Sequence, residues 1–170
     1  MLNAKLVDGR VYSLAVDAFT LYEKSRFGEK KDNRIEYSIF EALFLVQKGK
    51  MKLFLGNKEI SFDKLIVRLK KIDKKVELKY IVFSDLRNKG YVLKTALKFG
   101  AEFRVYEKGK RPGEEHARWI LHTASENDLL KWHDFTAKSR IAHSTKKNLL
   151  LGIVDDERDV TYYEVNWMRT

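Results

Sequence analysis

A run of charged residues near the middle of the chain most constrains how it can fold. Five of the six side chains in residues 70–75 are charged, and the run falls at the end of a predicted helix. We therefore place a domain boundary here, with an N-terminal domain at residues 1–75 and a C-terminal domain at residues 76–170. A chain of 170 residues can bury a substantial core. It contains no cysteine, which excludes disulfides, thiolate zinc sites and cysteine nucleophiles.

The balance of charge predicts a polyanionic partner. Lysine and arginine number 34 against 24 aspartates and glutamates, a net charge of +10. Most of the excess lies in residues 1–75, which hold 17 basic and 10 acidic side chains, whereas the remainder holds 17 and 14. Such an excess favours binding to nucleic acid. We see no signal peptide and no apolar run of about 20 residues, so we expect a cytoplasmic protein without a membrane anchor.

Local patterns in the first half predict a small domain that mixes strands and helices. Asp8-Gly9 lies between two alternating segments and predicts a hairpin, because both turn positions favour positive φ. We expect a helix at residues 16–25 and a loop at residues 27–34. Ser38 and Glu41 form a capping-box pattern that opens a second helix, and Gly49 follows its end.

Two further segments complete this half. Residues 52–55 predict a strand, and Ser61 is expected to cap a third helix. The apolar residues of this helix follow the spacing of one buried face. They are Phe62, Leu65, Ile66, Leu69 and Ile72.

The second half predicts a helix at residues 76–88 and another at residues 134–147. Strands are expected at residues 91–97, 102–106, 116–123, 149–154 and 160–167, and residues 108–115 predict a loop. The fold class is therefore α+β, with a small mixed α/β N-terminal domain followed by an α/β domain that has a mixed central sheet.

Several catalytic classes lack their motifs. There is no phosphate-binding P-loop and no Gly-x-Ser-x-Gly nucleophile motif. His116 and His122, on one predicted strand, would lie about 20 Å apart and could not share a metal ion. Glu77 and Lys79 match half of a metal-dependent nuclease pattern, which leaves a metal-dependent DNA nuclease as an alternative.

Several ordered motifs resemble the archaeal-type tRNA-intron (splicing) endonuclease family. They comprise residues 80–91 (YIVFSDLRNKGY), 103–109 (FRVYEKG), 111–117 (RPGEEHA), 140–147 (RIAHSTKK) and 160–165 (VTYYEV). The resemblance covers roughly residues 80–167 and is weaker around residues 41–43. It implies that the second domain is a nuclease domain.

The resemblance implies a catalytic triad of Tyr106, His116 and Lys147. In such an enzyme the 2′-hydroxyl of the RNA attacks the adjacent phosphate, so neither a metal ion nor another cofactor is required. His116 would donate a proton to the departing 5′-oxygen, since imidazole titrates near neutral pH. Lys147 would stabilise the charge that develops on the phosphate. Tyr106 would act as the base or would position the 2′-hydroxyl.

Two further residues are candidates for binding RNA. The resemblance implies that Arg140 and a second flat side chain clamp a bulged base, and Trp167 is our candidate for the second position. Guanidinium and indole groups both stack on bases. The alternative for Trp167 is a packing or interface residue at the end of a strand.

The resemblance also implies a substrate and an assembly. The substrate would be precursor tRNA with a bulge–helix–bulge fold, cut to leave 2′,3′-cyclic phosphate and 5′-hydroxyl ends. The chain would assemble as a homotetramer, or as a heterotetramer with a non-catalytic subunit. The acidic segment at residues 155–159 would dock into a basic pocket of a neighbouring subunit. The remaining alternative is that this chain is itself a non-catalytic RNA-binding subunit.

Overall fold

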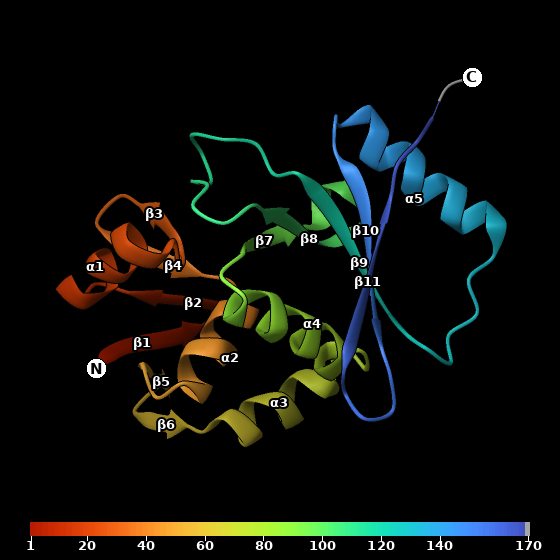
Figure 1. The fold of residues 1–170 in the computed structure, drawn as a ribbon. Helices are drawn as coiled ribbons and strands as arrows, with labels where there is room; N and C mark the ends of the chain where they lie inside the picture. The colour runs from red at the N-terminus through yellow and green to blue at the C-terminus, as the bar shows by residue number, and fades with distance from the viewer. Residues whose placement is uncertain (169–170) are drawn as a thin grey trace. The chain divides into compact units, whose positions relative to one another are not determined.

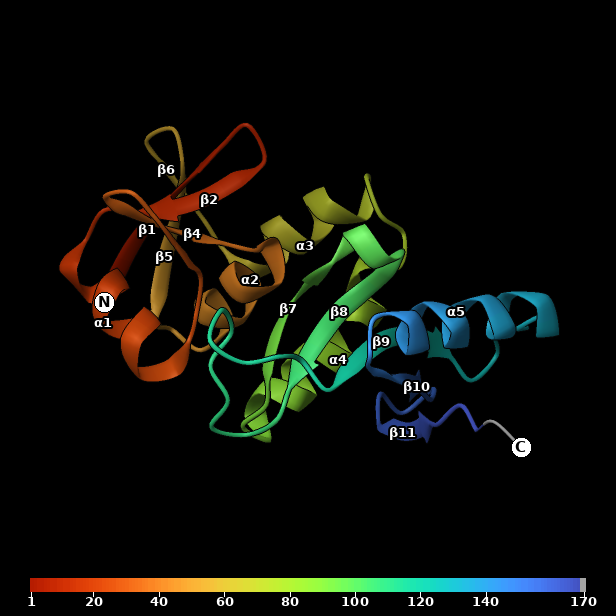
Figure 2. The same ribbon diagram turned by 90° about the horizontal axis from the view of Figure 1, so that it is seen from above.

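The computed structural model describes residues 1–168 and divides the chain into two compact units. The first comprises Met1–Glu77, and the second begins at Leu78. Each contains one β-sheet with helices (Figures 1 and 2). Among the described residues, no helix has the length and apolar character needed to cross a membrane.

The first unit is built on a six-stranded sheet in the order β3-β4-β2-β1-β5-β6. The strands are β1 (Leu2–Val7), β2 (Arg10–Ser13), β3 (Glu29–Lys31), β4 (Arg34–Tyr37), β5 (Met51–Leu55) and β6 (Lys58–Ile60). β1 and β5 are parallel and the other pairs are antiparallel, so the sheet is mixed. The predicted hairpin at Asp8-Gly9 is confirmed, and both residues have positive φ, 49° and 76°.

The loop predicted at residues 27–34 is wrong, because this segment contains β3 and the start of β4. The two strands form a hairpin whose turn begins at Asp32, which has φ of 50°. All three residues of β3 are exposed, so the segment shows no alternation of apolar and polar side chains. The short strand β6 was likewise absent from the prediction.

Three helices accompany this sheet, namely α1 (Val16–Ser25), α2 (Ile39–Gln47) and α3 (Phe62–Lys70). The capping box at Ser38 and Glu41 is confirmed. The buried Glu41 carboxylate accepts hydrogen bonds from the backbone N–H groups of Ser38 and Gly28, each at 2.9 Å. Hydrogen bonds to a charged group contribute about 1.5–3 kcal/mol each, so Glu41 fixes the chain on both sides of β4.

The buried face predicted for the third helix is only partly correct. Leu65 and Ile66 are buried, but Ile72 lies beyond the end of α3 and is 81% exposed. The helical spacing continued in the sequence for two residues after the helix itself had ended.

The second unit is built on a five-stranded sheet in the order β11-β10-β9-β8-β7. The strands are β7 (Val92–Ala96), β8 (Ala101–Tyr106), β9 (Trp119–Ser125), β10 (Asn148–Val154) and β11 (Val160–Val165). The helices are α4 (Val76–Asn88), the short 3₁₀ helix η1 (Leu97–Phe99) and α5 (Trp132–Ser144). β9 and β10 are parallel and the other pairs antiparallel, so the expected mixed sheet and α+β class are confirmed.

Helix α4 packs closely against the sheet of the second unit. The rings of Phe83 on α4 and Phe103 on β8 lie 5.4 Å apart. A Cβ atom added to Gly152 on β10 would lie only 3.0 Å from Val82 Cγ1, so the absence of a side chain lets α4 approach. The remaining helix, α5, contributes Ala142 and Phe135 to a second cluster that includes Ile120 and Leu149.

Candidate active site

The topology of the second sheet brings the ends of three strands together. β8 runs antiparallel to β9, and β9 runs parallel to β10, so the carboxyl end of β8 and the amino ends of β9 and β10 lie at the same edge. Arg118 N–H donates to the Val105 carbonyl and Asn148 N–H donates to the Arg118 carbonyl, each at 3.0 Å. These bonds hold the three strand ends together immediately beside Tyr106 and Lys147, two of the residues predicted to be catalytic.

Tyr106, His116 and Lys147 line one cavity at this edge, with a volume of about 200 Å³. Tyr106 is the last residue of β8, His116 lies in the loop before β9, and Lys147 directly precedes β10. Phe99, Arg104 and Glu115 are also among the lining residues. The structure therefore brings together all three residues of the proposed triad, which are separated by up to 41 positions in the sequence.

Tyr106 provides a largely buried wall of the cavity. It is only 4% exposed and packs in a cluster with Val92 and Ala117. This packing restricts the ring to one orientation, as is typical of close-packed interiors.

His116 lies three residues before its strand, so the strand predicted at residues 116–123 begins too early. β9 begins at Trp119, and His116 is exposed in the preceding loop. The Glu115 carboxylate accepts a hydrogen bond from Lys110 Nζ at 2.6 Å and another from the backbone N–H of Arg111 at 2.8 Å. These contacts hold the loop next to His116 while leaving its imidazole accessible to a ligand.

Lys147 also differs from its predicted position, because α5 ends at Ser144 rather than continuing to residue 147. Lys146 has φ of 57°, and the Lys147 N–H donates to the Ala142 carbonyl at 2.9 Å. This left-handed end of the helix is a common way to satisfy its last carbonyl groups. It turns the chain from α5 into β10 with Lys147 at the junction.

The Lys147 ammonium is held in a partly buried, cationic environment. Its Nζ donates to the Thr145 carbonyl at 2.9 Å and lies 5.9 Å from the centre of the Phe99 ring. Burial lowers the pKa of Lys147 below its usual range, and the Arg104 guanidinium lowers it further. An anion entering the cavity would therefore meet two neighbouring positive charges in a setting with less water than the surface.

Phe99, Arg104 and Glu115 line the cavity but are not among the site residues predicted from the sequence. Arg104 precedes Tyr106 by two residues, and residues two apart on a strand point to the same face. This two-residue period is the signal in the sequence that could have placed Arg104 beside Tyr106 in the site. Phe99 and Glu115 reach the cavity from a 3₁₀ helix and a loop, for which no such periodicity exists.

Arg140 and Trp167 do not line the cavity. Arg140 is exposed on α5, three residues before His143, and the Trp167 ring packs on the His143 ring with centres 4.2 Å apart. Trp167 is 53% exposed and lies two residues after β11, so it is not part of a strand core. Both candidate RNA-binding residues therefore lie around one turn of α5.

A second polar cluster, at Glu102 and His122, has a structural character. His122 Nδ1 lies 3.4 Å from a Glu102 carboxylate oxygen and 3.2 Å from Lys138 Nζ. Burial would raise the pKa of Glu102, but the hydrogen bond and charge of His122 outweigh it and the pKa is lowered. This cluster links β8, β9 and α5.

The residues of the metal-dependent alternative do not form a comparable site. Glu77 and Lys79 are two positions apart on α4, which directs them to different sides of the helix. Glu77 pairs with Lys70 at 2.8 Å. Within residues 1–168, no group of three or more histidine, aspartate or glutamate side chains is arranged to hold a metal ion.

Comparison with known families matches both halves of the chain. Residues 76–162 match the tRNA intron endonuclease catalytic C-terminal domain, and residues 2–66 match the tRNA intron endonuclease N-terminal domain. The chain belongs to the tRNA intron endonuclease family, and the resemblance noted from its motifs is confirmed.

Its curated relatives are archaeal proteins of similar length. The chain is 39% identical to the tRNA-splicing endonuclease of Thermococcus onnurineus over 169 residues, 99% of this chain and 97% of the relative. It is 42% identical to the tRNA-splicing endonuclease of Methanothermobacter thermautotrophicus over 149 residues, 88% of this chain and 86% of the relative. Identity to that of Nanoarchaeum equitans is 39% over 140 residues, 79% of this chain and 90% of the relative.

The charge environment of Lys147 gives a prediction about its titration. Replacing Arg104→Gln removes a neighbouring positive charge, so the pKa of Lys147 should rise and the amine should remain protonated to higher pH. Heteronuclear NMR of the lysine side chains measures this titration directly. Arg104→Lys keeps the charge and should leave the titration close to that of the wild type. An unchanged Lys147 titration in Arg104→Gln would contradict the electrostatic coupling.

Proposed function

We propose that this chain is a tRNA-splicing endonuclease that cuts precursor tRNA at the boundaries of an intron. The observation that carries the proposal is the convergence of Tyr106, His116 and Lys147 on one cavity. Membership of the family and the names of the archaeal relatives support the same activity.

The proposed reaction is a transesterification within the RNA. The 2′-oxygen loses its proton and forms a bond to the adjacent phosphorus, while the bond from phosphorus to the 5′-oxygen breaks. The 5′-oxygen gains a proton, so the products are a 2′,3′-cyclic phosphate and a 5′-hydroxyl. No water is consumed, and the nucleophile belongs to the substrate.

Each residue of the triad suits one part of this reaction. The exposed His116 donates the proton to the 5′-oxygen, because imidazole is the side chain best suited to exchange protons near neutral pH. Lys147, supported by Arg104, stabilises the negative charge on the pentavalent phosphorus. Tyr106 contacts the 2′-hydroxyl, either accepting its proton or orienting it. An ordinary phenol has a pKa of about 10, so the two roles predict different pH dependences for a Tyr106→Phe variant.

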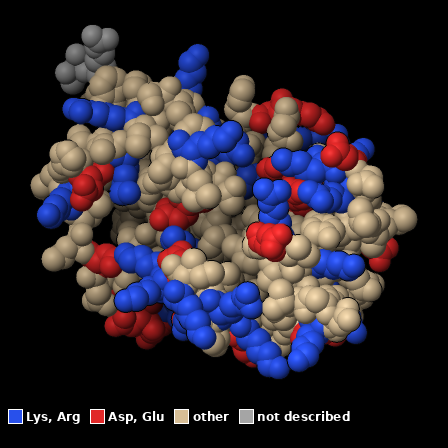
Figure 3. Space-filling view, turned by 180° about the vertical axis from the view of Figure 1, so that it is seen from behind, with Lys and Arg blue, Asp and Glu red and all other residues tan. Residues whose placement is uncertain are grey.

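The substrate proposed for this site is RNA with a bulge–helix–bulge fold. Attack by a 2′-hydroxyl in line with its own phosphate requires a distorted backbone, which an unpaired bulge supplies more readily than an A-form helix. Proteins recognise such features by shape and by stacking on unpaired bases. Basic side chains are spread over the face drawn in Figure 3, with acidic side chains between them, and provide phosphate contacts. We place this activity in the cytoplasm, which cell fractionation tests.

Arg140 and Trp167 are the residues that we propose to clamp a bulged base. Both are exposed, and the contact of Trp167 with His143 brings the indole to the turn of α5 that follows Arg140. A base could stack between a guanidinium plane and an aromatic ring in such an arrangement.

We further propose that four copies of the chain assemble, so that two active sites lie at a fixed separation and measure the distance between two bulges. β11 is an edge strand of its sheet, and its Tyr163 is 57% exposed. Edge strands present unpaired backbone groups to a second chain. The acidic segment at residues 155–159 is already ordered, since the N–H of Asp159 donates to the Asp155 carboxylate at 2.9 Å.

The cleavage prediction uses purified chain and precursor tRNA in EDTA. The wild type should cut both intron boundaries, and the 5′ fragment should end in a cyclic phosphate by mass spectrometry. Lys147→Ala should slow cleavage by about 100- to 1,000-fold, because a group that stabilises transition-state charge is lost, while RNA binding persists. Lys131→Ala, an exposed lysine outside the cavity, is the control.

Three results would contradict this mechanism. Undiminished cleavage by Lys147→Ala would remove the lysine from the site. Cleavage that requires added magnesium would favour the metal-dependent alternative with Glu77 and Lys79. Binding without cleavage in either condition would favour a non-catalytic RNA-binding subunit.

The clamp predicts an effect on substrate binding. Arg140→Ala should raise KM by about 5- to 150-fold, the range expected for loss of one stacked base, with little change in kcat. Trp167→Ala should act in the same direction. Steady-state cleavage measures both variants, and Arg68→Ala, an exposed arginine of α3, serves as the control. An unchanged KM in Arg140→Ala would exclude the clamp.

The assembly predicts the mass of the purified chain. Light scattering should report a tetramer at low salt and smaller species at high salt, because the acidic loop contributes charge attraction that salt screens. Reversing charge with Glu157→Lys should weaken the tetramer. A wild-type chain that forms tetramers only with a second polypeptide would instead support the heterotetramer.

A further inference from the structure

The two faces of the first unit's sheet differ in how far their side chains are exposed. Along β1, Leu2, Ala4 and Leu6 are buried, whereas Asn3 and Lys5 are exposed. The neighbouring strands β2 and β5 repeat this alternation, with apolar residues on the buried side. We call the other side, which carries Asn3 and Lys5, the open face.

Two aromatic rings flank a lysine on the open face. Lys5 on β1 pairs in register with Tyr12 on β2 and with Phe54 on β5. Since adjacent strands lie about 4.8 Å apart, the strands that carry the two rings are separated by about 10 Å. Tyr12 and Phe54 are half-buried, and Lys5 is exposed between them.

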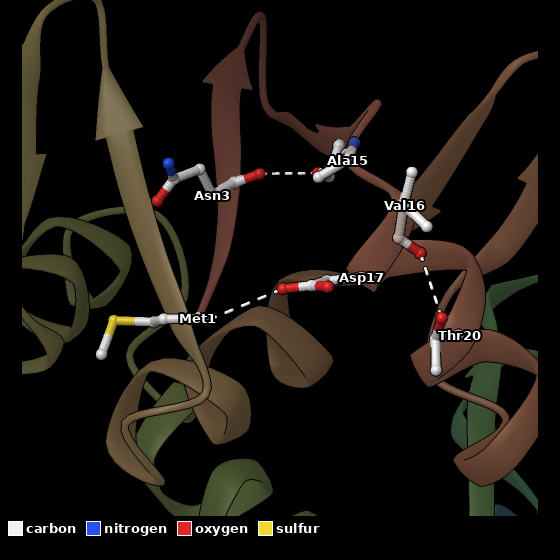
Figure 4. A network of polar contacts seen from close by, with 7 residues as sticks. Met1, Asn3, Ala15, Val16, Asp17 and Thr20 are labelled. Carbon is white, nitrogen blue, oxygen red and sulfur yellow. Dashed lines mark hydrogen bonds and ion pairs between the residues drawn. The ribbon is translucent and has the colours of Figure 1, made fainter.

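A groove of about 390 Å³ follows this row of side chains. Its walls include Asn3, Lys5, Tyr12, Leu14 and Phe54. One end is fixed where the Ser13 hydroxyl donates to the Asn3 carbonyl at 2.6 Å. Figure 4 shows Asn3 on β1 beside Ala15, the residue just before α1. The volume lies in the range of clefts that hold small ligands or single groups of larger ones.

Lys5 lies between the two rings on the open face, and Glu36 and Glu59 lie in register with Tyr12 and Phe54. The Arg34 guanidinium lies over the Tyr12 ring, 5.0 Å from its centre, and its Nε donates to Glu36 at 3.0 Å. Among residues 1–168, no acidic side chain is paired with Lys5. Residues 1–75 carry 17 basic and 10 acidic side chains, so most of the chain's net positive charge lies in this half. The residues that line the candidate active-site cavity lie between Phe99 and Lys147. The excess positive charge of residues 1–75 is therefore not part of that cavity.

We propose that the open face binds unpaired nucleotides of RNA, with bases stacked on Tyr12 and Phe54 and phosphates contacting Lys5 and Arg34. Aromatic rings on an exposed sheet, with cations beside them, bind single strands because every base offers a flat face and every linkage a charge. The groove between the rings accommodates the sugar–phosphate segment that joins two stacked bases. This site is separate from the residues assigned to cleavage.

The test is the binding of a fluorescent 2′-O-methyl oligouridine, which lacks the 2′-hydroxyl that the proposed reaction needs. Fluorescence anisotropy with the full chain measures its affinity. Tyr12→Ala and Phe54→Ala should each weaken binding by about 5- to 150-fold, as expected for one lost stack. Tyr12→Phe keeps the ring and should bind like the wild type, which also guards against a folding defect in Tyr12→Ala. Trp132→Ala, an exposed aromatic residue at the start of α5, is the control.

The outcomes separate this site from the proposed cleavage. Unchanged affinity in both alanine variants, or equal loss in Trp132→Ala, would overturn the proposal. Competition by polyglutamate as effective as that by unlabelled oligouridine would also overturn it, since charge alone would then suffice. The binding assay involves no cleavage, so it remains informative even if the chain fails to cut precursor tRNA. If it does cut, the alanine variants should raise KM and leave kcat unchanged.

Discussion

The hydrogen bonds between β8, β9 and β10 at one sheet edge are the constraint on which the candidate site depends. Arg118 donates to the Val105 carbonyl and accepts from Asn148, so one residue ties three strands together. Tyr106 directly follows Val105 in the sequence, and Lys147 directly precedes Asn148. Both therefore lie next to a residue that these bonds hold in place. Because a slip of one residue would send every side chain to the opposite face, the register of this sheet sets the composition of the cavity.

The same edge explains the electrostatic character of the site. Arg104 and Lys147 face one small cavity from β8 and from the junction before β10, and among residues 1–168 neither forms an ion pair with a carboxylate. Two unpaired cations in a half-buried setting repel one another, which costs stability in the empty protein. A phosphate bound there, as proposed, would relieve that repulsion. The arrangement is thus complementary to a charged ligand rather than to the free state, as differential binding requires.

Much of the fold was predictable because its signals are local. The helices at residues 16–25 and 76–88 have the predicted bounds, and the capping box at Ser38 lies where its pattern indicates. The β3–β4 hairpin was not predictable from alternation, because β3 is wholly exposed. The motifs supplied the residue types of the candidate site. Its geometry depends on a left-handed residue at Lys146 and on pairing between distant strands, neither of which leaves a periodic trace in the sequence.

The parallel pairing of β9 and β10 also has a consequence for the order in which the site forms. Parallel neighbours require a long crossover, here the segment that contains α5, and contacts between distant residues form slowly. A chain emerging from the ribosome exposes Tyr106 and His116 well before Lys147 can join them. Until β10 has inserted beside β9, the growing polypeptide has the phenol and the imidazole but lacks the lysine that completes the cavity. Synthesis of Tyr106 and His116 and completion of the cavity are therefore separated in time by the geometry of a single crossover.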